Sequence, residues 1–284
     1  MQIYFNDNFI NEEDLILRST NRSFKYGDGL FETIFVADQN PLFIDLHFNR
    51  LCTGMNLLGI EIPQNWDNHS FKRIIIDLSK RNNLQNARCR ITIWRAGDGL
   101  YFPLLNTAEF LIELSEHVKN EYELNPVGIK LGIFNEIPKL LHPLSAIKTA
   151  NSLVYILAAK YASEQNLNDV VILNQEGRIA DTISANIFIF RNNQLFTPSV
   201  NEGGIDGIMK KIIIELCMLE GFGVNQEQLK LDDLNGADEI FLSNVISGIK
   251  WVSELHNKKY ANKFSTDLVY ILNEAIRNNT LVSA

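Results

Sequence analysis

Apolar residues recur along this chain at two spacings, and each spacing predicts a different kind of element. Alternation of apolar and polar residues predicts strands in "RCRITIWR" (88–95) and "AEFLIEL" (108–114). Apolar residues three or four positions apart predict a helix in "DLHFNRLCTGMNLLG", with Asp45 as its N-cap and Gly59 at its end. Strands and helices therefore both contribute to the fold.

Short turn-forming sequences separate the other apolar stretches. They predict hairpins in "IYFNDNFI", "LFETIFVADQNPLFI", "VVILNQEGRIA" and "NIFIFRNNQLFTP", and single strands in "GIKLGIF" and "DEIFLSN". Further helices are expected in "SFKRIIIDLSKRN", from the segment after Lys148 to about Ser163, from near Asp206 to Gly221, and at the C-terminus. These elements do not alternate regularly as strand, helix, strand, so the pattern favours an α+β fold.

The segment 115–126, "SEHVKNEYELNP", is polar and lacks periodicity, as is typical of an interdomain linker. The sequence therefore predicts a small N-terminal α+β domain over 1–114 and a larger C-terminal α+β domain over 127–284, which would carry Lys148. A cleft between two domains is a common place for a small ligand.

The composition and charge of the chain argue against several classes of protein. A chain of 284 residues with 46% hydrophobic and 21% charged residues is typical of globular proteins. No apolar run is long enough to span a membrane, and "MQIYFNDNF" lacks the features of a signal peptide, so we expect a cytoplasmic protein. A net charge of −8 without a basic stripe argues against nucleic acid as a partner. Three separated cysteines in apolar surroundings predict reduced core residues, with neither a disulfide nor a metal site.

Lys148 stands out because it follows the apolar "PLSAI" and precedes Thr149, Asn151 and Ser152, at a predicted strand-to-helix junction. A lysine on an amphipathic helix usually extends into solvent, and a surface lysine is the commoner explanation. Burial of an ammonium group is costly unless its pKa falls or it gains a partner. A functional amine is the alternative explanation.

The segment "EGGIDGIMKK" is a candidate phosphate site. Its glycines lead into a predicted helix whose first turn contains Ile208 and Met209. Backbone N–H groups at such a helix start can bind a phosphate. The simpler alternative is that Asp206 caps the helix and the glycines only turn the chain.

Arg50 and Asp181 complete a possible set of functional groups. Arg50 could grip a phosphate through two bonds, or it could form an ordinary surface salt bridge. Asp181 could be a turn residue, or a carboxylate that partners a buried cation. An amine, a phosphate cradle and a carboxylate together are what pyridoxal phosphate requires, since the lysine forms its Schiff base and the carboxylate keeps its pyridine nitrogen protonated.

Six motifs resemble, in the same order, those of the class IV aminotransferases, the fold-type IV pyridoxal phosphate enzymes. They are "YGDGLFET", "HFNRL", "IKTANSL", "EGRIADTISANIFIF", "GIMK" and "FLSNVISGI", and they extend over nearly the whole chain. The family includes branched-chain aminotransferases, D-amino acid aminotransferases and 4-amino-4-deoxychorismate lyases. The resemblance implies a two-domain fold of the D-amino acid aminotransferase type, with the cofactor at the domain interface, and a homodimer.

The resemblance also implies roles for individual residues. Lys148 is the Schiff-base lysine and catalytic residue, and Asp181 partners the pyridine nitrogen. The phosphate is held by Arg50, by N–H groups of Ile208 and Met209, and by Ser243 or Asn244. The substrate-side candidates are Phe31, Thr149, Asn151, Arg95 and Tyr101.

Three features depart from the family pattern. Asp181 replaces the usual glutamate, so the carboxylate is one methylene shorter. "WRAGDGLYFP" replaces a loop that carries an extra arginine in the lyases and the D-amino acid enzymes, and Phe31 replaces a tyrosine of the latter. The loop and Phe31 argue against D-amino acid specificity, and Asp181 bears on activation of the cofactor.

We therefore predict a pyridoxal phosphate-dependent aminotransferase that exchanges an amino group between an L-amino acid and a 2-oxo acid. One alternative is 4-amino-4-deoxychorismate lyase, which eliminates pyruvate and leaves 4-aminobenzoate. "KTAN" and "GIMK" favour the lyase, and the missing arginine loop argues against it. The other alternative is a protein that binds the cofactor with little turnover.

Overall fold

The computed structural model describes residues 1–281, which form two compact units. Unit 1 contains Met1–Glu121 and the short segment Ile147–Asn151. Unit 2 contains Tyr122–Ala146 and the described residues from Ser152 onward. Lys148, which the sequence placed in the C-terminal domain, thus groups with unit 1. The change from one unit to the other at Glu121 falls inside the segment predicted as a linker.

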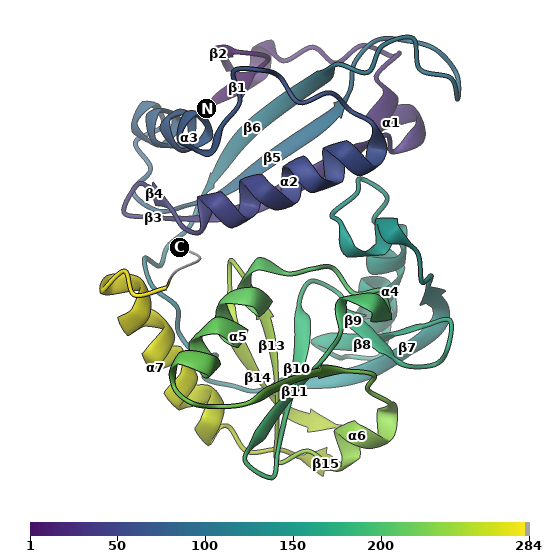
Figure 1. Cartoon of the computed structure of the whole chain (residues 1–284), viewed down its shortest axis with the longest axis vertical. Coiled ribbons are helices and arrows are strands. Elements are labelled where there is room, and N and C mark those ends of the chain that lie inside the picture. The colour runs from purple at the N-terminus through teal and green to yellow at the C-terminus, as the bar shows by residue number, and fades with distance from the viewer. Residues whose placement is uncertain (282–284) are drawn as a thin grey trace. The chain divides into compact units, whose positions relative to one another are not determined.

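Unit 1 is built on a six-stranded antiparallel sheet with the strand order β2-β1-β6-β5-β3-β4 (Figure 1). Helices α2 and α3 pack on one face of it, where their apolar residues form a core with those of the strands. Cys89, Ile91 and Ile93 all point into this core, as their alternation predicted. The strands are β1 (Gln2–Phe5), β2 (Asn8–Asn11), β3 (Gly29–Ala37), β4 (Asn40–Pro41), β5 (Ala87–Arg95) and β6 (Ala108–Glu116). The helices are η1 (Glu12–Asp14), α1 (Arg22–Tyr26), α2 (Ile44–Leu58) and α3 (Asn68–Arg81).

The two ends of α2 differ in how well the sequence predicted them. Gly59 ends the helix in the left-handed conformation, with φ of 65°, as expected. The assignment of Asp45 as the N-cap is wrong, because Phe43 is the N-cap and no side chain caps the helix. The Asp45 carboxylate instead accepts a hydrogen bond from Nδ2 of Asn68, at 2.6 Å, and so links α2 to α3.

The segment Ile147–Asn151 adds to the edge of β3. The two-residue strand β4 pairs with only the last residues of β3, which leaves the beginning of β3 available. There the N–H of Phe31 donates to the carbonyl of Lys148 at 2.9 Å, and the N–H of Ala150 donates to Gly29 at 2.9 Å. These backbone bonds fix Lys148 beside Phe31.

Ile147 anchors the same segment in the core of unit 1. Gly54 of α2 makes room for this packing, because a Cβ atom there would approach Leu30 Cδ1 to 2.9 Å and Ile147 Cδ1 to 3.7 Å. An alanine at position 54 would therefore press on the Leu30 side chain, whereas its contact with Ile147 would be an ordinary one.

Unit 2 is built on a nine-stranded mixed sheet with the order β12-β11-β10-β13-β14-β7-β8-β9, and β15 pairs with β14. Strand β7 runs parallel to both of its neighbours, and the predicted hairpins β8–β9 and β10–β11 are present. The strands are β7 (Ile129–Lys139), β8 (Asp169–Asn174), β9 (Ile179–Thr182), β10 (Asn186–Arg191), β11 (Gln194–Pro198), β12 (Val224–Glu227), β13 (Glu239–Asn244), β14 (Gly248–Leu255) and β15 (Lys258–Lys259).

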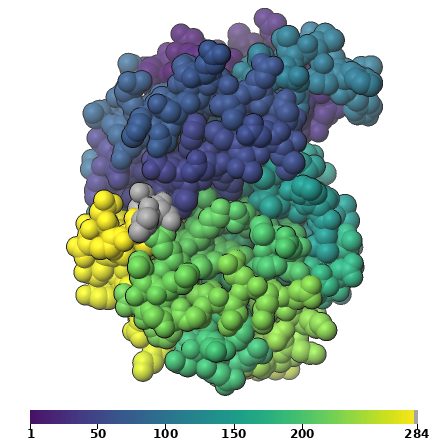
Figure 2. All heavy atoms as spheres, in the orientation of Figure 1, coloured from purple at the N-terminus to yellow at the C-terminus, as the bar shows by residue number. Residues whose placement is uncertain are grey.

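Helices surround this sheet, and α5 and α7 reach the surface of unit 2 that faces the viewer in Figure 2, coloured green and yellow. None of the helices within residues 1–281 is long and apolar enough to cross a membrane. The helices are η2 (Pro143–Ala146), α4 (Leu153–Glu164), η3 (Val200–Glu202), α5 (Ile208–Leu219), α6 (Leu231–Asn235) and α7 (Lys263–Arg277).

Candidate active site

Lys148 lies against an aromatic ring that it shares with an arginine. Its Nζ is 4.5 Å from the centroid of the Phe31 ring, and the guanidinium carbon of Arg90 is 4.0 Å from the same centroid. Cations are attracted to the face of an aromatic ring. Phe31 therefore keeps two positive groups close together, separated by no more than the sum of these distances.

Arg90 extends from β5 on the face of the sheet opposite to the core. Its Nε donates to Thr92 Oγ1 at 3.2 Å, and it lies 3.9 Å from the Glu113 carboxylate. Its side chain is 30% exposed, and Glu113 is 45% exposed. An exposed pair at this distance contributes little, so the guanidinium can exchange Glu113 for an incoming anion.

Arg50 is held by a buried carboxylate that the sequence did not single out. Glu32, on β3, is 2% exposed and accepts from Nε of Arg50 at 2.7 Å and from Nη2 at 2.6 Å. Glu32 Oε2 also lies 2.7 Å from Nδ1 of His47, which is 1% exposed. Arg50 is thus a buried, doubly bonded arginine, and its interpretation as a surface salt bridge is wrong.

These contacts set the charges of the cluster. Burial alone would raise the pKa of Glu32, but Arg50 and His47 outweigh it and lower this pKa to about 2, so Glu32 is ionised. Burial lowers the pKa of His47, and the positive charges of Arg50 and Lys148 act in the same direction against the opposing effect of Glu32. His47 is therefore neutral near pH 7, and its Nδ1–H donates to Glu32.

Arg95, a predicted substrate-side residue, is fully engaged within unit 1. It donates to the carbonyls of Leu58 at 2.5 Å and Gly59 at 2.8 Å, where it stabilises the C-terminal end of α2. Its Nε also lies 3.0 Å from the Asp28 carboxylate, which is shared with the buried Arg22. The expectation that Arg95 meets the substrate is therefore not supported by its contacts, because α2 and Asp28 occupy its donors.

Three other substrate-side candidates lie in unit 1 and have different surroundings. Nδ2 of Asn151 donates to the Gly27 carbonyl at 3.1 Å, so Asn151 ties the Lys148 segment to the turn before β3. Thr149 forms an isolated β-bridge with Leu30. Tyr101 is 87% exposed and contacts the ring of Tyr26. Thr149 and Asn151 thus position Lys148.

Asp181 lies at the centre of a buried polar cluster in unit 2. Its Oδ2 accepts from the N–H of Ile205 at 3.0 Å and from the hydroxyl of Tyr155 at 3.3 Å, and its Oδ1 accepts from Asn186 at 3.4 Å. The ammonium of Lys139 lies 3.9 Å from Oδ2. Asp181 is therefore a carboxylate that partners a buried cation, and the alternative of a simple turn residue is wrong.

Lys139 and Lys210 are further buried amines of unit 2. Burial lowers the pKa of each, and the charge of Asp181 opposes this effect in both. Nζ of Lys139 donates to the Tyr155 hydroxyl at 2.5 Å, and Nζ of Lys210 donates to the carbonyl of Pro198. Lysines with a lowered pKa are candidates for Schiff-base chemistry, so both are rivals of Lys148.

The glycine-rich segment before α5 packs against the Asp181 cluster. A Cβ atom at Gly204 would lie 2.3 Å from the carbonyl oxygen of Ala180, and one at Gly207 would lie 1.8 Å from Asn186 Oδ1. Asp206 does not cap α5, because Gly207 is the N-cap, and the Asp206 carboxylate instead pairs with Lys211 at 2.6 Å.

The first turn of α5 meets the requirements for an anion site. The first N–H groups of an α-helix lack partners within the helix, and no side chain caps this one, so Ile208 and Met209 can donate. The buried Oγ of Ser243 has no hydrogen-bond partner among the described residues. The Asn244 side chain is used in a turn, since its Oδ1 accepts from two N–H groups and its Nδ2 donates to a carbonyl. Of the two alternatives, Ser243 is therefore the phosphate candidate.

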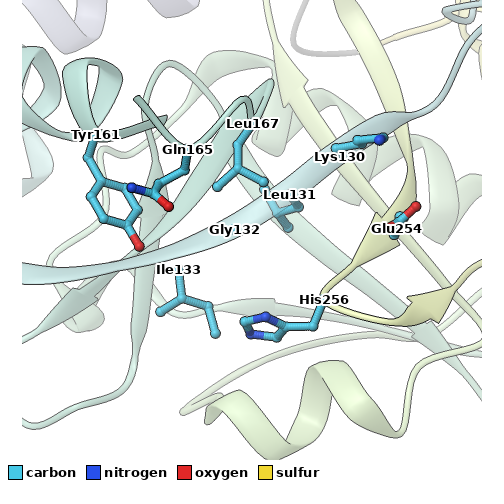
Figure 3. Close-up of a pocket in the computed structure, with 9 residues that line it drawn as sticks. All are labelled: Lys130, Leu131, Gly132, Ile133, Tyr161, Gln165, Leu167, Glu254 and His256. Carbon is cyan, nitrogen blue, oxygen red and sulfur yellow. The ribbon is translucent and has the colours of Figure 1, made fainter. Parts of the chain in front are cut away.

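A pocket of about 240 Å³ lies elsewhere in unit 2 (Figure 3). It is lined by Lys130, Leu131, Gly132, Ile133, Tyr161, Gln165, Leu167, Glu254 and His256. It shares no residue with the Asp181 cluster or with the first turn of α5. Within residues 1–281, no group of three or more His, Cys, Asp or Glu side chains could hold a metal ion.

Comparison with known proteins identifies the family. The sequence pattern of "Amino-transferase class IV" matches residues 29–255, which is most of the chain. This protein belongs to the class IV aminotransferases. The resemblance of the six motifs is thereby confirmed, and the class IV chain is an enzyme with the fold-type IV architecture.

Individual class IV relatives differ in their named activities. A putative branched-chain-amino-acid aminotransferase of Methanocaldococcus jannaschii is 27% identical over 98% of this chain and 96% of its own. The structure of a putative 4-amino-4-deoxychorismate lyase from Legionella pneumophila, 26% identical, covers 93% of this chain and 96% of that one, with a TM-score of 0.83. A hypothetical aminotransferase from Mycobacterium tuberculosis, solved in its PLP-bound form, is 16% identical, covers 98% and 100%, and has a TM-score of 0.84.

The sequence did not single out five residues that contact Arg50, Lys148 or Asp181, or that share a ring with one of them. They are Glu32, His47, Arg90, Lys139 and Tyr155. Glu32 and His47 belong to two of the quoted motifs, so their residue types were a usable signal. Nothing local distinguishes Arg90, Lys139 or Tyr155 from ordinary strand and helix residues.

Proposed function

We propose that this class IV enzyme is a pyridoxal phosphate-dependent aminotransferase, which transfers an amino group between an L-amino acid and a 2-oxo acid and in which Lys148 forms the Schiff base. The observation that carries the proposal is the placement of Lys148. Backbone bonds to β3 fix its main chain, and its amine lies on the Phe31 ring beside Arg90. The amines of Lys139 and Lys210 are instead bonded inside unit 2.

Each unit contains groups that suit the cofactor. In unit 2, Ser243 supplies a buried hydroxyl with no partner among the described residues and α5 supplies uncapped N–H groups; in unit 1, Arg50 supplies a guanidinium held in place by Glu32. Asp181 is an anion suited to a protonated ring nitrogen. When bound, pyridoxal phosphate supplies an aldehyde and an electron-withdrawing ring. Lys148 would bind the aldehyde and afterwards move the proton between Cα of the substrate and the cofactor.

Arg90 is the residue that we propose for a substrate carboxylate, in place of Arg95. Apart from the Phe31 ring, the contacts of Arg90 within residues 1–281 are a 3.9 Å approach to Glu113 and a bond to Thr92, whereas the donors of Arg95 are occupied. An arginine is well suited to bind a carboxylate through two bonds. Because Arg90 and Lys148 share the Phe31 ring, an amino acid near Lys148 would have this guanidinium within reach.

The test of the proposal is the position of the Schiff base. Borohydride reduction of the protein loaded with pyridoxal phosphate, followed by peptide mapping, is expected to label Lys148. Lys148→Ala should abolish the label. The matched variant Lys139→Ala, which removes a buried amine of unit 2, should keep the label. A label on Lys139 or Lys210 would contradict the proposal.

The lyase is the second candidate, because a relative of the same fold and 26% identity carries that name. A transaminase converts bound cofactor to its amino form with an L-amino acid alone, and a 2-oxo acid reverses the spectral change. Silence with common L-amino acids, together with release of 4-aminobenzoate from aminodeoxychorismate, would establish the lyase instead. No spectral change and no product would indicate a protein that binds the cofactor with little turnover.

A homodimer and a cytoplasmic location remain parts of this proposal. Helix α4 exposes Leu153, Ile156 and Leu157, at 70%, 59% and 39%, and several large apolar side chains on one short helix can form a surface that another copy covers. Ile156→Glu is expected to reduce the mass measured by light scattering if α4 lies in the dimer interface. An unchanged mass would exclude α4 from that interface.

A further inference from the structure

His47 has one ring nitrogen without a partner. Its Nδ1 is bonded to Glu32 at 2.7 Å, but its Nε2 is buried and accepts no hydrogen bond from any described residue. Buried polar atoms are nearly always hydrogen-bonded, so an exception in a functional cluster points to a missing partner. Because Nδ1 donates to an ionised carboxylate, Nε2 of the neutral ring is an acceptor.

The charges around His47 explain why it is neutral before an anion arrives. Three charged groups face it: Glu32 on β3, Arg50 on its own helix, and Lys148 in the segment along β3. Glu32 already neutralises Arg50, so Lys148 leaves the cluster with one net positive charge. A second positive charge on His47 is therefore unfavourable, and burial opposes it further.

A phosphate dianion changes this balance. Bound at Arg50, it would bring two negative charges into a buried cluster with a single net positive charge. In a poorly solvated site, an uncompensated charge is costly unless a nearby group titrates. His47 is the group with an available position for a proton, since Nε2 is unbonded and Glu32 already stabilises the imidazolium through Nδ1.

We infer that binding of a phosphate-bearing ligand at Arg50 is coupled to uptake of one proton from solvent onto Nε2 of His47. No covalent bond other than this N–H forms, and no electron is transferred. Glu32 and His47 are thus positioning residues for the anion. The inference rests on the proposed function, because it takes the phosphate of pyridoxal phosphate as the ligand.

Pyridoxamine 5'-phosphate is a suitable probe, because it forms no Schiff base with Lys148. Its binding to cofactor-free protein is measured by calorimetry near pH 8 in two buffers of different ionisation enthalpy, with pyridoxamine as the phosphate-free control. Asp181 is proposed to keep the ring nitrogen protonated, so either probe can take up a proton there, and only the difference between the two probes reports on His47. We expect the wild type to take up about one proton more with the phosphorylated probe than with pyridoxamine. His47→Gln should lose this difference in proton uptake and bind the phosphorylated probe about tenfold more weakly, because no imidazolium then compensates the charge of the anion.

The matched control is His69→Gln, which changes an exposed histidine of α3 and should behave like the wild type. Nitrogen-15 spectra of histidine-labelled wild type give a second measurement that needs no variant. They should show His47 neutral without ligand and as an imidazolium with the probe.

A difference in proton uptake between the two probes that persists in His47→Gln, or a His47 ring that stays neutral in the complex, would overturn the inference while leaving the proposed function intact. Titration with inorganic phosphate separates the two remaining cases. If phosphate protonates His47 but pyridoxamine 5'-phosphate does not bind, the proton coupling stands and the proposed cofactor is wrong. If neither probe binds, both proposals fall.

Discussion

Replacement of Glu32 by glutamine removes the charge that holds Arg50 in place. The pKa of Glu32 falls from 4.5 to about 2, with Arg50 and His47 outweighing the effect of burial. At about 1.4 kcal/mol for each tenfold change in proton affinity, the ionised carboxylate contributes about 3 kcal/mol to the free energy of unfolding. We therefore expect Glu32→Gln to lose about 3 kcal/mol near pH 7, in line with loss of one partner of a buried ion pair.

The pH dependence gives a sharper test. A depressed folded-state pKa contributes stability that is fully present above 4.5 and is lost as the pH falls toward about 2. At about pH 3.5 roughly 1 kcal/mol of this contribution is gone. The difference in stability between wild type and Glu32→Gln should therefore shrink by about 1 kcal/mol between about pH 6 and pH 3.5.

Urea unfolding followed by tryptophan fluorescence measures this difference, since two of the three tryptophans, Trp66 and Trp94, lie in unit 1. The matched control is Glu113→Gln, which removes a half-exposed carboxylate from the same sheet and should change stability by less than about 0.5 kcal/mol. Equal stabilities of wild type and Glu32→Gln at pH 7, or parallel curves down to pH 3.5, would refute the reasoning.

Three further predictions concern the candidate site. Asp181→Asn keeps the shape of its cluster but removes the negative charge, so cofactor should still bind while turnover falls about a hundredfold, equivalent to about 3 kcal/mol; steady-state rates and absorbance spectra check this, and wild-type turnover would refute it. Gly207→Ala forces a Cβ atom toward Asn186 Oδ1 and should destabilise the protein by about 1–3 kcal/mol, whereas Gly223→Ala, with open space around it, should be nearly neutral in thermal unfolding. Arg90→Met should raise KM about tenfold with little change in kcat or stability, because a binding contact is lost. A higher KM for every amino acid would mean that Arg90 binds the α-carboxylate of the substrate, and a higher KM for acidic amino acids alone would mean that it binds their side-chain carboxylate. An unchanged KM would exclude Arg90 as a substrate-binding residue.

Local sequence patterns were sufficient for much of the fold. The alternation of Cys89, Ile91 and Ile93 follows from the two-residue repeat of a strand, so it predicted which side chains face the core. The turn at Asn192 and Asn193 is likewise local, because both residues adopt the left-handed conformation that asparagine tolerates. Such features depend on neighbours along the chain, and the sequence contains those neighbours.

Lys148, Arg50 and Asp181 could be named from the sequence because their residue types and motif order indicate the chemistry. The groups that surround these three residues could not be predicted in the same way. Each is set by contacts between segments far apart in the chain, such as Lys148 on the ring of Phe31.

Pairing between distant segments depended on the tertiary structure alone. Glu32 meets Arg50 and His47 because β3 packs beneath α2, and no local pattern states which strand lies under which helix. Packing between distant segments also explains the contacts of two other residues. Arg95 donates to the end of α2, although a substrate role was expected of it, and Asp45 accepts from Asn68 of α3, although it was expected to cap α2. Charged side chains are long and can reach several partners, so their bonds follow the packing of the backbone around them.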